Sequence, residues 1–265
     1  MAVNILDTKH IFVGLIKGSQ DMNLEDNINK CQLDYSYQEL LAFGLVNENV
    51  SLPYLREYID FLDTLNIEGI IKKAINIVAT HTKAIQTNIV ILPLDPQNQF
   101  YIHYMGGIVA HTNGANTIYI YLSPSNKLKS FVNRLESIIV HEYQHILRNY
   151  HSSPNATLLD VLIDEGLSEL FVKVLLGEDR LGAWAKWNSN NIIKKNKELI
   201  EEYLYTTNPH TIRTIMNGSE ELGIPLWLGY SVGFSILDFH WLNKNNDLNA
   251  LVKMKAEEIY NHDSF

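Results

Sequence analysis

The string HEYQH, from His141 to His145, has the residue types and the spacing of a metal site that can hydrolyse a bond. In an α-helix, residues four apart lie on one face, one turn apart, so both imidazoles can reach a single metal ion while Glu142 stands beside it. Imidazole is a common zinc ligand, and a carboxylate can take a proton from a water molecule that zinc has acidified. The pattern therefore predicts a zinc-dependent hydrolase in which Glu142 is the general base and later the proton donor to the leaving group.

This geometry requires a helix, and the flanking sequence predicts one. Between Asn126 and about Asn149 apolar residues recur at intervals of three and four, after a Ser-Pro-Ser sequence typical of a helix start. The motif lies in the last turns of this predicted helix. We expect the helix to be buried because of its apolar positions, Leu128, Phe131, Val132, Leu135, Ile138, Ile139 and Ile146.

A catalytic zinc ion usually has three protein ligands and one open position, so two histidines leave one ligand to be found. A second amphipathic helix is predicted from Ala156 to Leu176, after the turn-rich segment HSSPNAT. On it lies Glu165, twenty residues after the second histidine, which we predict to be the third ligand. The alternatives are a solvated position for Glu165 or ligation by Asp164, which has a shorter reach and points about 100° away around the helix. Glu169, one turn after Glu165, is predicted to accept the free ring N–H of a ligating histidine.

HEYQH followed by the glutamate of DEGLSEL resembles the signature of the gluzincin metallopeptidases, such as thermolysin and aminopeptidase N. With IIVHEYQHILR, TLLDVLIDEGLSELF and LGYSVGF, the chain more closely resembles a bacterial family of predicted zinc-dependent proteases of unknown function, from about Ile89 to Phe239. Gln144 and Ser168 depart from the related patterns, but neither position is a ligand. The resemblance implies one bound Zn²⁺ and an α+β, zincin-like fold. We expect a small, mostly antiparallel sheet and an active-site helix, flanked by N-terminal and C-terminal helices.

A tyrosine late in the chain is a candidate for stabilising the oxyanion of the reaction. Tyr230, followed three residues on by Gly233, is similar to the tyrosine region of the aminopeptidases and lies in a predicted apolar helix. The resemblance implies that its hydroxyl donates to the oxyanion. An ordinary core or interface tyrosine is nearly as good an explanation. His210 and His240 are weaker candidates for the same role.

Short strands are predicted upstream of the metal helix, and the segment GGIVAH, which begins at Gly106, matters for substrate binding. We expect it to be an edge strand that holds an extended peptide by main-chain hydrogen bonds. A simple turn or bulge at Gly106 and Gly107 is equally consistent, and His111 gains no ligand role from either interpretation. Asn113-Gly114 predicts a hairpin. The strand patterns cover residues 88–94, 100–105, 107–112 and 117–122.

Helical patterns dominate outside this middle segment. The predicted organisation is a helical N-terminal region (1–87), a zincin core with the sheet and the metal helices (88–177) and a helical C-terminal lobe (178–265), expected to pack as one compact unit. The N-terminal helices either cover one side of the sheet or form a small separate lobe. No Gly/Ser-rich or charged linker and no internal repeat separates them. The further predicted helices cover residues 37–46, 53–65, 70–85, 190–205, 225–243 and 247–261.

Composition is typical of an enzyme with a large core: 265 residues are 46% hydrophobic. A net charge of −9 makes nucleic acid a poor partner. No apolar run has the roughly eighteen residues of a membrane span, and the first thirty residues lack a signal-peptide pattern, so we expect a cytoplasmic protein without membrane contact. Cys31, the single cysteine, cannot form an internal disulfide, which agrees with a reducing compartment.

The leading hypothesis is a zinc metallopeptidase that acts on peptide or protein substrates. An exopeptidase would need an acidic cluster for the free amino terminus, and none is identifiable around GGIVAH, so an endopeptidase or oligopeptidase is favoured. One alternative is an inactive or regulatory peptidase-like binding protein, although the intact Glu142 argues against it. Another is a hydrolase of a non-peptide amide or ester, because metal-activated water does not distinguish leaving groups. Substrate identity and oligomeric state stay open.

Overall fold

A computed structural model describes residues 3–18, 23–113, 116–149, 155–244 and 247–263. Its contacts divide the chain into two compact units, residues 1–75 with 84–139 and residues 76–83 with 140–265. The helix α7 (Leu128–Asn149) contributes its first part to one unit and its last part to the other. These units do not follow the three segments expected from the sequence, whose limits as domains stay a prediction.

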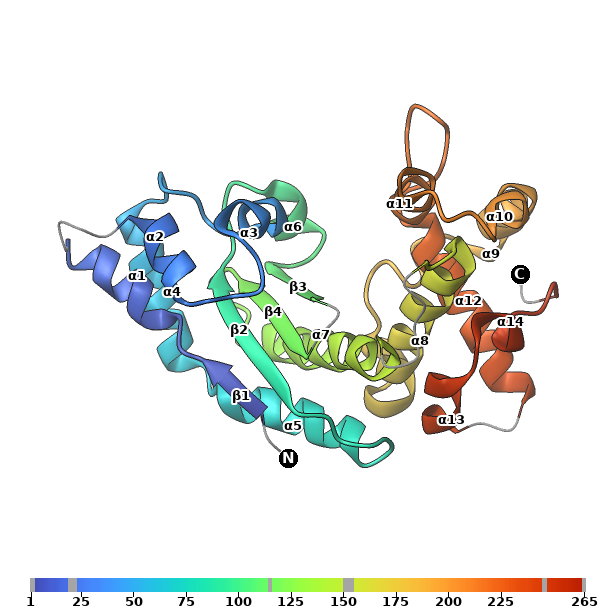
Figure 1. Ribbon diagram of the computed structural model, residues 1–265, viewed down its shortest axis with the longest axis horizontal. Helices are drawn as coiled ribbons and strands as arrows, with labels where there is room; N and C mark the ends of the chain where they lie inside the picture. Colours follow the sequence, from blue (N-terminus) through green and yellow to red (C-terminus); the bar gives the residue numbers. More distant parts are fainter. Residues whose placement is uncertain (1–2, 19–22, 114–115, 150–154, 245–246, 264–265) are drawn as a thin grey trace. The chain divides into compact units, whose positions relative to one another are not determined.

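The first unit contains a mixed sheet of four strands among the described residues, in the order β1-β2-β4-β3 (Figure 1). β1 pairs parallel with β2, β2 pairs parallel with β4, and β3 pairs antiparallel with β4. Every residue of β4 is buried, as expected for a central strand whose apolar sequence is covered on both faces. The strands are β1 (Val3–Leu6), β2 (Thr87–Pro93), β3 (Ile108–Thr112) and β4 (Thr117–Leu122).

The prediction of a mostly antiparallel sheet is wrong, since two of the three pairings are parallel. β1 was not predicted, and the helical stretch between β1 and β2 is long enough for the crossover that a parallel pair requires. The antiparallel pair β3–β4 is where the sequence predicted a hairpin. Gly114 of its predicted turn lies outside the described residues.

The strand predicted for residues 100–105 is also wrong, because residues 100–103 belong to the short helix α6 (Gln99–His103). The Asn98 side chain caps the helix by accepting a hydrogen bond from Tyr101 N at 3.2 Å. Phe100 and Tyr104, four residues apart, stack with ring centroids 5.2 Å apart. Aromatic residues that resemble an alternating strand pattern thus follow helical spacing.

Helices of the first unit support the first half of α7. Phe61 of α4 meets Phe131 of α7 with ring centroids 4.9 Å apart, and Lys73 of α5 donates to the buried Glu136 of α7 at 2.6 Å. These contacts fix the start of the helix that carries the metal-ligand candidates. The helices are α1 (Lys9–Ile16), α2 (Leu24–Lys30), α3 (Tyr37–Phe43), α4 (Leu52–Thr64) and α5 (Ile67–Ala79), which runs into the second unit.

The second unit is helical, and its centre is the contact of α8 with α12. A β-carbon on Gly166 of α8 would lie 2.2 Å from Gly233 O of α12, and one on Gly233 would lie 2.2 Å from Leu162 O. The two backbones therefore touch where only glycine fits. The described helices here are α8 (Leu158–Leu176), the 3₁₀ helix η1 (Glu178–Arg180), α9 (Asn190–Lys195), α10 (Lys197–Tyr203), α11 (Pro209–Asn217), α12 (Leu228–Asn243), α13 (Leu248–Lys253) and α14 (Ala256–Ile259).

Most long helices fall where the sequence predicts them, and the differences lie at breaks. The predicted helix 190–205 is two helices that meet at Asn196, and 247–261 is two short helices on either side of residues 254–255. α1, α2 and α11 were not predicted. No helix of the described ranges combines the length and the apolar composition needed to cross a membrane.

Candidate metal centre

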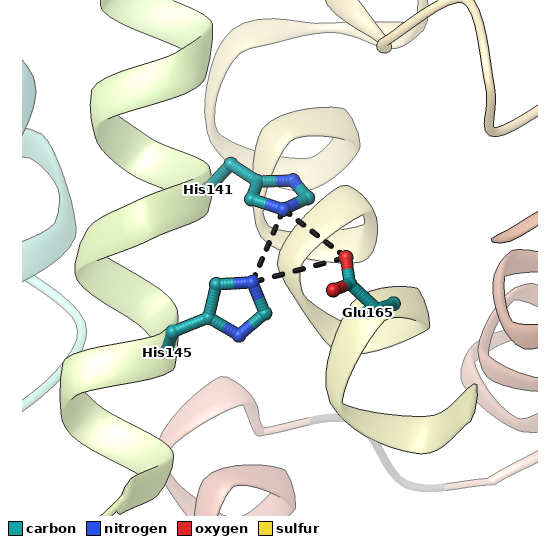
Figure 2. A group of neighbouring side chains, drawn as sticks. All are labelled: His141, His145 and Glu165. Carbon is teal, nitrogen blue, oxygen red and sulfur yellow. Dashed lines mark hydrogen bonds and ion pairs between the residues drawn. The ribbon is translucent and has the colours of Figure 1, made fainter. Parts of the chain in front are cut away.

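Three side chains converge between α7 and α8 in the second unit (Figure 2). His141 Nε2 lies 3.2 Å from His145 Nε2 and 3.3 Å from Glu165 Oε2, and His145 Nε2 lies 3.8 Å from the same oxygen. Both histidines lie on one face of α7, and the Glu165 side chain extends toward them from the N-terminal half of α8. Among the described residues these three form a group whose ligand atoms all lie within 4.8 Å of one another.

The spacing of these three atoms fits a zinc ion. In a tetrahedral site with bonds of about 2.0–2.1 Å, two ligand atoms are separated by about 3.3 Å. A triangle with sides of 3.2, 3.3 and 3.8 Å has a circumradius of about 2.0 Å, so one point lies at bonding distance from all three atoms. Two imidazoles and one carboxylate are also a donor set of catalytic zinc. The residues present therefore fit the metal.

A carboxylate holds the outer nitrogen of each histidine. His141 Nδ1 lies 2.9 Å from Glu169 Oε1, and the other oxygen of the buried Glu169 accepts from Gly182 N at 2.9 Å. His145 Nδ1 lies 2.9 Å from Asp164 Oδ2. Donation of both Nδ1–H groups outward leaves each Nε2 lone pair facing the shared point. Glu169 thus lies where the sequence placed it, whereas the contact of Asp164 was missed because Asp164 was considered only as an alternative ligand.

Arg148 is a second residue that sequence reasoning missed. It is buried on α7, with Nε 3.9 Å from Asp164 Oδ1. One guanidinium nitrogen donates to the carbonyls of Leu251, Val252 and Met254 at 3.2, 3.2 and 2.9 Å. Arg148 therefore connects α13 and the residue after it to the carboxylate that orients His145. The signal in the sequence was its place one turn after His145 on the same helix.

Comparison with known proteins identifies the family. Residues 67–261, more than half of the chain, match the model of the family described as "Predicted Zn-dependent protease (DUF2268)". The chain belongs to this family. The match confirms the resemblance to a family of predicted zinc-dependent proteases and extends beyond the stretch from Ile89 to Phe239 on both sides.

Two curated relatives of the chain come from Bacillus subtilis (strain 168). The "Uncharacterized protein YjfC" is 26% identical over 138 residues, which cover 48% of this chain and 46% of YjfC. The "Uncharacterized protein YjaZ" is 26% identical over 166 residues, 56% of each protein. The chain thus spans about half the length of these relatives, and their names assign no activity. No solved structure matches the chain significantly.

Electrostatics at the centre of this member of the predicted Zn-dependent protease family favour a cation. Burial lowers the pKa of His141, but Glu165 and Glu169 outweigh it and raise that pKa well above its usual range. Burial likewise lowers the pKa of His145, and Asp164 with Glu165 raises it to about 9. These carboxylates create a strongly negative potential around the imidazoles, which a divalent cation at the Nε2 atoms would offset.

Glu142, the predicted general base, follows His141 directly on α7 and is also buried. Burial raises the pKa of its carboxyl above the usual range, the two imidazoles lower it, and Glu165 and Asp164 raise it further. Gln144 and Ser168, the two departures from related motifs, contact each other, because the Ser168 hydroxyl donates to Gln144 Oε1. They form a buried polar contact between α7 and α8 behind the ligands.

The remaining candidates are Tyr230 and two histidines on α11 and α12. Tyr230 is half-buried on α12, one turn before Gly233, and its catalytic role stays a prediction. His240 Nδ1 bonds to Ile259 O at 3.0 Å, which is a structural contact between α12 and α14. His210 is exposed in the first turn of α11. The structure therefore supplies no second reason to prefer either histidine.

The segment GGIVAH contains both features that the sequence left open. Gly106 and Gly107 have φ angles of 65° and 75°, so they form a turn in a left-handed conformation that favours glycine. The strand that follows, β3, is an edge of the sheet. The His111 ring on β3 packs among the aromatic rings of Tyr35, Phe43, Tyr119 and Tyr121. Peptide binding along β3 stays a prediction.

Proposed function

We propose that this protein is a zinc metallopeptidase of gluzincin type, with a zincin-like fold, that hydrolyses peptide bonds. The proposed ligands are His141, His145 and Glu165. The observation that carries the proposal is the convergence of these three ligand atoms at zinc-binding distances, immediately beside a carboxylate on the same helix. Membership in a family described as predicted Zn-dependent proteases supports the same conclusion.

Each residue then has a defined task. Bound zinc would supply a Lewis acid that lowers the pKa of a water molecule and polarises a substrate carbonyl. Glu142 would accept a proton from the attacking water as the water oxygen bonds to the carbonyl carbon, and would give the proton to the amine nitrogen as the C–N bond breaks. Glu169 and Asp164 hold the imidazole rings in the tautomer that offers Nε2. Tyr230 is proposed to donate its hydroxyl hydrogen to the oxyanion.

We propose an endopeptidase or oligopeptidase whose substrate is an extended segment of a peptide or protein. The proposal includes no nucleic acid and no membrane among the partners.

Metal analysis followed by digestion of a peptide library tests the proposal. We expect about one zinc per chain and peptide cleavage that stops when a chelator is added and returns when zinc is restored. The parent protein and the His141→Ala variant are compared as a matched pair. The variant should bind no zinc and cleave no peptide. Stoichiometric zinc without cleavage of any peptide would favour a regulatory binding protein. Cleavage of small esters or amides alone would favour a non-peptide hydrolase.

A further inference from the structure

The segment between α8 and α9 is attached to the metal centre at two points. Gly182 N donates to Glu169 Oε2 at 2.9 Å, and the Trp184 ring meets the His141 ring edge-to-face, with centroids 5.9 Å apart and an interplanar angle of 89°. A β-carbon on Gly182 would lie 2.3 Å from Trp184 Cε2, so the indole rests directly on the Gly182 backbone. Trp184 is therefore held against one proposed zinc ligand and beside the partner of that ligand.

Two further tryptophans continue from Trp184 to the surface. The rings of Trp184 and Trp227 are 6.3 Å apart, and those of Trp227 and Trp187 are 5.0 Å apart, both edge-to-face. Trp227 is 5% exposed and Trp187 is 46% exposed. Trp227 also has a φ of 56°, a left-handed conformation that is costly for a bulky residue and is maintained only where surrounding structure enforces it. A continuous row of ring contacts thus leads from His141, through the buried Trp227, to the exposed Trp187.

A buried hydrogen-bond network holds the segments that carry Trp184 and Trp227 in place. The Ser231 hydroxyl donates to Trp184 O at 2.9 Å and accepts from Asn188 N at 3.2 Å. Asn188 Nδ2 also donates to Leu226 O at 2.9 Å, just before Trp227. Ser231 and Asn188 are both buried. The network ties the Trp184 segment to the first turn of α12, so the tryptophans are in place before any ligand arrives, which favours binding.

The polar atom of the Trp184 ring is covered. Its Nε1 is covered by neighbouring atoms and has no hydrogen-bond partner among the described residues, while the residue as a whole is only half-buried. Any ring atom that Trp184 offers to a ligand is therefore carbon. Such a surface binds aromatic and large aliphatic groups through apolar burial and edge-to-face ring contacts.

We infer that Trp184, supported by Trp227 and Trp187, is the specificity-determining wall of the substrate site and selects peptides with an aromatic or large aliphatic side chain beside the scissile bond. This inference rests on the proposed peptidase function, because it assigns the substrate class of that same centre. Trp184 acts by contact with the substrate side chain and takes no part in proton transfer.

Hydroxamate binding tests the wall without any hydrolysis. The zinc-loaded Glu142→Gln protein is titrated by calorimetry with acetohydroxamic acid and with 3-phenylpropionohydroxamic acid, which share the metal-binding group and differ in the phenyl group. We expect the phenyl compound to bind about tenfold tighter or more, the effect of burying roughly half of a phenyl ring. Adding Trp184→Ala should reduce this preference to about threefold or less. Trp241→Ala, near the other end of α12, is the matched control and should preserve it.

Cobalt(II) quenching of tryptophan emission tests the position of Trp184 independently of any organic ligand. One equivalent of cobalt should reduce the emission of the parent protein and of Trp241→Phe to a similar fraction. Trp184→Phe, which keeps an aromatic ring and so protects the fold, should lose most of this quenching. Equal quenching in Trp184→Phe and the parent would refute the placement of Trp184 beside the metal.

The outcomes separate the inference from the proposed function. If both hydroxamates bind equally well, the wall is wrong and the metal centre stands. If neither binds the zinc-loaded protein, the zinc has no open position for a substrate, so the proposed function fails and the inference fails with it. If the phenyl preference depends on Trp184 but no peptide is cleaved, the apolar wall is supported and the peptidase proposal is refuted. Cleavage of library peptides beside aromatic or large aliphatic residues, lost in Trp184→Ala, supports both.

Discussion

Replacing Gly166 with alanine tests the packing that places Glu165 at the metal centre. Gly166 follows Glu165 on α8, and its Cα faces the backbone of α12 rather than α7. The added β-carbon would lie 2.2 Å from Gly233 O and 2.3 Å from Gly233 C. Both atoms belong to helical backbone, so no side-chain rotation can relieve the overlap.

The size of the effect follows from these distances. A carbon–oxygen contact needs roughly 3.2–3.4 Å, so α8 and α12 must separate by about 1 Å at this point. Overpacking of this kind costs about 1–3 kcal/mol, and the better helix propensity of alanine offsets up to about 1 kcal/mol of it. We expect a net loss of about 1–2 kcal/mol in the free energy of unfolding. Zinc ligand distances tolerate only about 0.2 Å, so a shift of Glu165 by a fraction of that separation should lower zinc affinity at least about tenfold.

Urea unfolding and competition with a chromophoric zinc chelator measure the two effects on one protein. Gly69→Ala is the matched control, because the nearest atoms to the added β-carbon there belong to the side chain of Asn66, at 2.5 Å, which can move at the loss of its hydrogen bond from Gly69 N. We expect the control to keep both the zinc affinity and the stability of the parent to within about 1 kcal/mol. A Gly166→Ala protein with unchanged stability and unchanged zinc affinity would refute the close helix crossing and the reasoning that links it to the ligand.

Three further predictions concern single residues. Glu142→Gln should retain zinc and reduce kcat/KM for a cleaved peptide by a factor of about 10²–10⁴, and parental turnover would exclude Glu142 as the base. Glu169→Ala should weaken zinc binding about 10–100-fold in the chelator assay, because His141 Nδ1 and Gly182 N lose their acceptor; unchanged affinity would contradict the orienting role. Burial lowers the pKa of His111 to about 4. Because the unfolded chain takes up this proton near pH 6.5 and the folded chain only near pH 4, stability is full above pH 6.5 and falls as the pH drops between these values. The loss from pH 7.5 to pH 5 should be up to about 2 kcal/mol, and His111→Phe should remove it in urea titrations at the two pH values; an unchanged pH dependence would disprove this origin.

Local pattern was enough to find the elements that carry the site. α7 and α8 occupy Leu128–Asn149 and Leu158–Leu176, close to the predicted ranges, since long apolar periodicity and the Thr157 cap act within a few turns of chain. The strand order was beyond reach. Parallel pairing of β1 with β2 depends on residues more than eighty positions apart, and the aromatic pattern of α6 fits both strand and helix until the Asn98 cap is seen.

Among the residues that surround the proposed metal ligands, the sequence likewise predicted some positions and missed others. Glu169 was predicted because its spacing from Glu165 is fixed by the helix itself. Asp164, Arg148 and Trp184 were not assigned their positions, because each contacts the histidines or their partners through a different helix or loop. The direction in which each of these side chains points depends on how the helices pack, as at the contact of Gly166 with α12. No rule based on the local sequence specifies this packing.

The amino-acid sequence alone determined the chemistry of this protein: two imidazoles one helical turn apart, a carboxylate between them and a glutamate on the next helix, because helical spacing is a property of the local chain. Tertiary structure alone decided the mixed sheet, the orientation of each imidazole by Glu169 and Asp164, and the tryptophan wall beside His141. These features arise from contacts between segments distant in the chain, whose register is set by burial and close packing over the whole unit and is not written into any short stretch of residues.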